Sequence, residues 1–182
     1  MKKTTIILSG IIFIYIIFFS LSAGQLYYGD EVVFLIASEE ISTGKIVGHF
    51  SFTNGIINDN LSTMLVHPPT YIYLLSLFIK LFGNSSYVVR SVSALFSIGV
   101  IILIYLTTKK ILKKRNIEKS ENWALFAAFL YAINPLAIQS SIIIDIDGGL
   151  LNFFSLLFIY LYISKKSYLY LIPSLFMIFA SK

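Results

Sequence analysis

A long apolar stretch without charge constrains this chain most: no charged residue occurs between Thr4 and Gly29. A transmembrane helix needs about 20 consecutive apolar residues to cross about 30 Å of hydrocarbon. Hydrophobic residues make up 57% of the chain and charged residues 13%, whereas soluble domains are about 25% charged. The chain is therefore expected to be an integral membrane protein. Further apolar runs lie at 68–82, 91–108, 123–144, 148–164 and 167–181.

Composition also argues against two functional classes. The net charge is +5, but the basic residues flank apolar runs instead of forming a soluble surface, so nucleic acid is not an expected partner. The chain contains no cysteine, which excludes disulfides, thiolate nucleophiles and cysteine zinc sites.

The basic residues predict an orientation in the membrane. They cluster at Lys2–Lys3, in the block 109–119 and at Lys165–Lys166, and cytoplasmic loops carry the excess of Lys and Arg. All three clusters share one side only if the short run 68–82 does not cross, so this run is expected to lie in the outer interface. The run 4–24 is expected to be a span, with a cleaved signal peptide as the alternative.

The expected architecture is an all-α, polytopic protein with about five transmembrane helices, in the plasma membrane and with a cytoplasmic N-terminus. A long outside loop, 25–89, follows the first span and carries interfacial helices. Within it, 31–44 is expected to be helical and 46–66 irregular. A basic cytoplasmic loop is expected at 109–121. The spans are expected at 4–24, 90–108, 122–141, 148–164 and 167–182.

On this map, ionisable residues gather at the outer face. Two carboxylates follow the first span, and two more lie between the third and fourth spans. Ionisable groups at the membrane are costly and are often functional. A carboxylate can act as a general base, paired carboxylates can hold a divalent cation, and a basic side chain can bind phosphate. The set is Asp30, Glu31, His67, Arg90, Asp145 and Asp147.

Three stretches follow the first span in order: YYGDEVVF, HPPTYIYLLSLFIKLFGNSSYVVRSVSALF and NPLAIQSSIIIDIDGG. This arrangement resembles the N-terminal part of GT-C glycosyltransferases, especially protein O-mannosyltransferases and aminoarabinose-type lipid A transferases. The resemblance covers nearly the whole chain. It implies an inverting transfer of a sugar from a polyprenyl-phosphate donor to an acceptor at the outer membrane face.

The resemblance also implies roles for the outer-face residues. Asp30 matches the catalytic acid, which deprotonates or orients the acceptor, and Glu31 completes the pair; a polar stop and a helix cap are the structural alternatives. Asp147, or else Asp145, matches the second acidic site, with a turn before the fourth span as the alternative.

The basic residues are expected to bind substrate. His67 lies where the family often has a polar or basic residue near the carrier phosphate, and Arg90 matches an arginine at the head of the second span. Asp145 is assigned to substrate binding with them. A structural His before Pro-Pro and an arginine at the lipid headgroups are the alternatives. Cofactor use stays open, a divalent cation included.

The expected partners are membrane lipid, the polyprenyl-phosphate sugar donor and a partner membrane chain. Family members are longer, and this sequence ends at Lys182 within the fifth expected span. It is therefore expected to be a fragment of a longer enzyme, half of a split enzyme or a truncated product. A non-catalytic membrane subunit that binds lipid carrier or a partner protein is the alternative function.

Overall fold

The computed structural model describes residues 3–24, 30–44, 52–53, 56–57, 70–144 and 149–180. This described part is helical, except for strands β1 (Phe52–Thr53) and β2 (Ile56–Ile57), which pair antiparallel. The predicted irregular stretch 46–66 thus contains a short hairpin. The helices are α1 (Lys3–Ser22), α2 (Asp30–Ser42), α3 (Thr70–Phe82), α4 (Ser86–Lys114), α5 (Ser120–Ala132), α6 (Pro135–Ile142), α7 (Gly149–Ile163) and α8 (Tyr168–Ala180).

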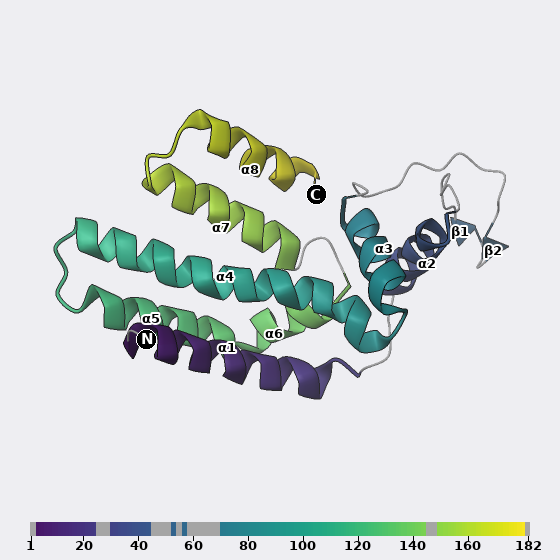
Figure 1. Cartoon of the computed structure of the whole chain (residues 1–182), viewed down its shortest axis with the longest axis horizontal. Coiled ribbons are helices and arrows are strands. Elements are labelled where there is room, and N and C mark those ends of the chain that lie inside the picture. Colours follow the sequence, from purple (N-terminus) through teal and green to yellow (C-terminus); the bar gives the residue numbers. More distant parts are fainter. Residues whose placement is uncertain are drawn as a thin grey trace.

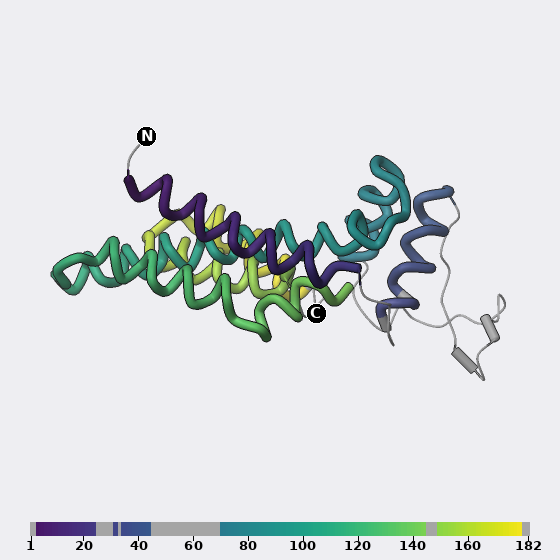
Figure 2. The backbone as a smooth tube through the Cα atoms, turned by 90° about the horizontal axis from the view of Figure 1, so that it is seen from below, coloured from purple at the N-terminus to yellow at the C-terminus, as the bar shows by residue number. Residues whose placement is uncertain are grey.

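The long helix α4 is the centre of a bundle. It contacts α5, α1 and α6 on one side and α7 on another, and α8 packs against α7 (Figure 1). Helices α2 and α3 pack on each other and lie beyond the end of the bundle where α4 begins (Figures 1 and 2). The chain thus forms a helical bundle with a helical pair at one end.

The two largest apolar cores of the described residues hold these parts together. The first joins the helical pair to the start of α4 and includes Phe34, Tyr71 and Leu75. The second lies in the bundle between α1, α4 and α5, where Tyr15 and Ile101 are fully buried against small residues such as Ala128. Small side chains allow close approach of helices within a membrane.

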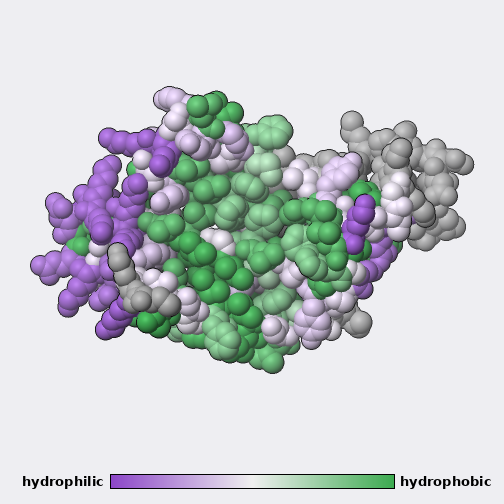
Figure 3. Space-filling view, viewed as in Figure 1, coloured by the Kyte–Doolittle hydropathy of each residue, from purple (hydrophilic) through white to green (hydrophobic). Residues whose placement is uncertain are grey.

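The outer surface of the bundle is apolar. Figure 3 shows hydrophobic side chains across its middle and hydrophilic ones gathered at the end with the α4–α5 loop. Large hydrophobic side chains such as Phe13, Leu130 and Phe176 are exposed on it. By length and composition, α1 and α4 can cross a membrane, and α5 with α6 make a third candidate span. The helical class and the membrane character expected from the sequence are confirmed, whereas the count of five spans stays a prediction.

The helices depart from the expected map at two places. The predicted span 122–141 is broken into α5 and α6, which meet at an angle of 58°. Pro135 causes the break, because the residue before a proline is pushed out of the helical region, and Asn134 caps α6 by accepting a hydrogen bond from the Leu136 amide at 2.9 Å. The predicted loop 109–121 also begins too early, since α4 continues to Lys114.

Candidate functional site

The six residues predicted at the outer face do not all fall in the described part of the chain. Asp30 is the first residue of α2 and Glu31 the second, while Arg90 lies near the start of α4. The structure brings Glu31 and Arg90 together. His67, Asp145 and Asp147 lie outside the described residues.

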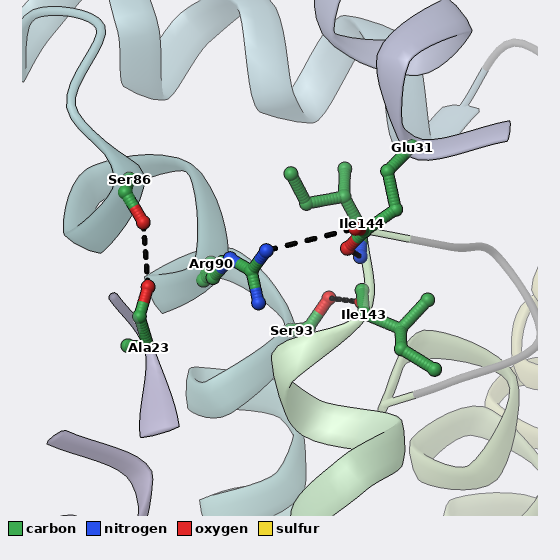
Figure 4. Close-up of polar contacts among 7 residues, drawn as sticks. All are labelled: Ala23, Glu31, Ser86, Arg90, Ser93, Ile143 and Ile144. Carbon is green, nitrogen blue, oxygen red and sulfur yellow. Dashed lines mark hydrogen bonds and ion pairs between the residues drawn. The ribbon is translucent and has the colours of Figure 1, made fainter. Parts of the chain in front are cut away.

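Glu31 and Arg90 form a buried ion pair. Arg90 Nη2 lies 3.6 Å from Glu31 Oε2, and the two residues are 1% and 6% exposed (Figure 4). Burying one charge alone would be very costly, and an opposite charge close by reduces that cost. The pair therefore fixes the start of α2 against the start of α4.

The same carboxylate also holds the connection between α6 and α7. The backbone amide of Ile144 donates a hydrogen bond of 2.8 Å to Glu31 Oε1. In the sequence, Glu31 follows Asp30 and Ile144 precedes Asp145. One hydrogen bond thus joins the two acidic segments, although 113 residues separate its partners along the chain.

A second set of hydrogen bonds supports this connection. Ser93 Oγ donates to the Ile143 carbonyl at 3.3 Å (Figure 4), and it lies 2.7 Å from the Tyr71 hydroxyl. On the other side of Arg90, Ser86 donates to the carbonyl of Ala23, which follows α1 (Figure 4). Helices α1, α3, α4 and the end of α6 are therefore linked around the ion pair.

Helix α2 is positioned by its own packing on α3. Phe34 meets the Tyr71 ring edge-on, at 6.2 Å between centroids. One turn later, Ser38 donates to the carbonyl of Phe34 and also lies 3.2 Å from the carbonyl of Ile72. At the far end of α2, Glu39 accepts a hydrogen bond from Asn84. These contacts place the N-terminus of α2, with Asp30, at the bundle.

A cavity of about 640 Å³ lies beside the ion pair. Both Glu31 and Arg90 line it, and Gln139 adds a neutral polar group. Its other walls are mainly apolar, and they come from α1, α6 and the residues flanking α6. They are Phe18, Ser22, Ile133, Pro135, Ile138, Ile142 and Ile143. An apolar cavity with a few convergent polar groups is the usual form of a small-ligand site.

The described residues of this site include one carboxylate, Glu31, and one guanidinium, Arg90. Among them, no group of three or more His, Cys, Asp or Glu side chains could hold a metal ion. The negative charge of Glu31 neutralises the positive charge of the Arg90 guanidinium. The pair therefore offers no net positive charge to an anionic ligand.

Several residues of this site were not predicted from the sequence. The Ile143 and Ile144 backbone groups carry no side-chain signal, and Ser93 and Tyr71 look like ordinary polar positions in apolar helices. Gln139 follows the NPLAI stretch and was the one detectable signal, because an uncharged amide within an apolar run is costly unless it is paired or faces a cavity.

A comparison with protein families identifies the family of this chain. Residues 66–180 match the family described as dolichyl-phosphate-mannose-protein mannosyltransferase, which is more than half of the chain. The matched stretch contains Arg90 and Ile144, whereas Asp30 and Glu31 precede it. No curated protein and no solved structure matches the chain. The resemblance to GT-C enzymes is confirmed: the chain belongs to the dolichyl-phosphate-mannose-protein mannosyltransferase family, a family of membrane glycosyltransferases.

Proposed function

We propose that this chain carries the catalytic end of an enzyme that transfers a sugar from a polyprenyl-phosphate donor to an acceptor at the outer membrane face. The family supports a membrane glycosyltransferase with a lipid-linked donor. The observation that carries the finer proposal is the hydrogen bond from the Ile144 amide to Glu31. It ties the segment with Asp30 to the segment that leads into Asp145 and Asp147.

Asp30 is the proposed general base. Its carboxylate takes the proton from the acceptor hydroxyl, whose oxygen then attacks the anomeric carbon of the sugar. The bond between that carbon and the phosphate oxygen breaks, and the carrier phosphate leaves with the bonding electrons. A single displacement of this kind inverts the configuration at the anomeric carbon.

The ion pair has a positioning role in this proposal. Glu31 is buried and engaged with Arg90 and the Ile144 amide, so it holds the acidic segments in place instead of taking a proton. Arg90 holds Glu31, in place of the phosphate contact expected from the sequence. Asp147 and Asp145 are proposed to complete the acidic site, and His67 to contact the carrier phosphate.

The cavity suits the lipid part of the donor. Phe18, Ile138 and Ile142 offer an apolar wall beside the polar end formed by Glu31, Arg90 and Gln139. The isoprenoid chain of the donor matches this apolar wall. Because the Glu31–Arg90 pair has no net charge, the carrier phosphate is proposed to lie against His67 instead.

The substitution Asp30→Asn tests whether Asp30 is the general base. The assay uses membranes from the cells that naturally produce the enzyme. Transfer from dolichyl-phosphate mannose, the donor that the family description names, is expected to fall at least about 100-fold, the lower end of general-base contributions. Glu40→Gln is the matched control, because it makes the same carboxylate-to-amide change in α2.

Both variants should insert into the membrane at the wild-type level. Transfer retained by Asp30→Asn would refute the base assignment. If the wild-type chain transfers no sugar but co-purifies with another multispan protein, the non-catalytic subunit replaces this proposal.

A further inference from the structure

A second cavity, of about 590 Å³, lies at the other end of the bundle. It is formed where the end of α4 meets the turn between α7 and α8. Three lysines line it: Lys114 from α4, and Lys165 and Lys166 from the turn. This site is separate from the proposed catalytic site, which lies where α4 begins.

The turn that carries two of these lysines is well defined. The amides of Lys165 and Lys166 donate to the carbonyls of Tyr162 and Leu161 at 3.0 and 3.2 Å, which closes the end of α7. Lys165 has a φ of 51°, a left-handed conformation that favours glycine. A lysine at such a position costs stability, which is consistent with a use for its charge.

The positive charge at this cavity is not offset. Within the described part of the chain, neither of the two ion pairs involves Lys114, Lys165 or Lys166, and all three are exposed. The nearby Lys110 is already engaged, since it donates to Ser164 at 2.7 Å and lies over the Tyr160 ring. The cavity therefore attracts an anion.

Its surroundings are those of a lipid headgroup region. Tyr162 and Tyr168 line the cavity and are largely exposed, and tyrosines gather at the level of lipid headgroups. The adjoining surface of α8 is apolar, with Leu169 and Ile172 exposed. A ligand with an anionic head and an apolar tail would match both parts.

We propose that this cavity binds the phosphate headgroup of an anionic phospholipid, with its acyl chains along α8. Basic pockets between transmembrane helices are suited to such headgroups. The three lysines bind the phosphate, and the two tyrosines flank the glycerol region. The bound lipid anchors the α7–α8 hairpin to the membrane leaflet in which that lipid lies.

Native mass spectrometry of the purified full chain tests the site. The chain is mixed with equimolar phosphatidylglycerol and phosphatidylcholine of identical acyl chains, and the retained adducts are counted. Wild type should retain phosphatidylglycerol preferentially. Lys165→Gln with Lys166→Gln should reduce that preference about 10-fold to 30-fold, because each basic residue near an anionic surface contributes roughly fivefold.

Two further variants separate the site from general charge and from folding. Lys113→Gln with Arg115→Gln removes the same charge from the same end but not from the cavity lining, and should keep the preference. Lys165→Gly relieves the backbone strain, so it should weaken the preference without lowering the unfolding temperature.

Three results would overturn the proposal. One is an equal loss of preference in the Lys113–Arg115 control, which would mean diffuse attraction. Another is equal retention of both lipids by the wild type. The third is displacement of the lipid by soluble glycerol 3-phosphate at the same concentration, which would mean that the site takes free phosphate.

Discussion

At the scale of single residues, each buried charge of the Glu31–Arg90 pair is stabilised by the other. Both side chains are almost fully buried. Removing one partner of such a pair leaves a buried charge uncompensated, at a cost of about 3–5 kcal/mol, while removing both is often nearly neutral. Arg90→Met should therefore destabilise the chain by about 3 kcal/mol, and adding Glu31→Gln should recover most of that loss.

The measurement is a double-mutant cycle on the free energy of unfolding in mixed micelles. The partly exposed pair of Lys109 and Glu121 is the control: Lys109→Met with Glu121→Gln should show much smaller coupling, because solvent screens ion pairs that it reaches. Strictly additive effects of Glu31→Gln and Arg90→Met would show that the buried charges do not depend on each other.

The same pair shows what the sequence could and could not predict about the site. Charge patterning was enough to place Glu31 and Arg90 at one face, since basic clusters fix the orientation of the spans. The third member, the Ile144 amide, could not be predicted, because every residue except proline carries the same backbone donor. The position of the end of α6 decides which backbone amide reaches Glu31, and tertiary packing sets that position.

At the scale of helices, α7 and α4 approach closely because Gly149 has no side chain. A Cβ added there would clash with the Ser93 carbonyl and lie 3.1 Å from Ser97 Oγ. The obstacle is backbone, so Gly149→Ala has to push α7 away from α4. Overpacking of this kind typically costs about 1–3 kcal/mol, and the apparent unfolding temperature in detergent should fall.

Gly10→Ala is the matched control, because a Cβ at that position in α1 meets nothing within 4 Å. Alanine has the higher helix propensity, so this variant should unfold at the wild-type temperature or slightly above it. An unchanged unfolding temperature for Gly149→Ala would mean that the two helices are not held in the described contact.

The helices differ in how far the sequence predicts them. The uninterrupted run of apolar residues predicts α1. The spacing of Val33, Ala37 and Ile41, four residues apart, is enough to predict α2. The break at Asn134–Pro135 was visible as a sequence signal, yet the apolar run continues through it and suggests one span. The lysines that extend α4 suggest a loop because they are charged, although lysine is a good helix former.

At the scale of the whole molecule, α7 follows α4 along most of its length. Gly149, at its start, packs on Ser93, and Ser164, just after its end, accepts a hydrogen bond from Lys110. Ser93 and Lys110 lie 17 positions apart in α4, a rise of about 26 Å at 1.5 Å per residue. The 15 residues of α7 rise about 22 Å themselves, so α7 runs beside α4 and its end returns to the basic end of the bundle.

This arrangement gives the last prediction, on topology. Helix α3 lies with α2 beyond the end of the bundle where α4 begins, whereas α7 runs beside α4, so α4 should be the second crossing. Single cysteines are unambiguous because the native chain has none. With a membrane-impermeant maleimide on intact cells, Thr43→Cys after α2 should label, whereas Glu118→Cys and Ser167→Cys should label only after permeabilisation.

Labelling of Glu118→Cys in intact cells would mean that α3 crosses, and would place the basic end of the bundle outside. If Glu118→Cys stays protected while Ser167→Cys labels in intact cells, α7 does not return across the membrane, and the contact between Lys110 and Ser164 would have to be abandoned.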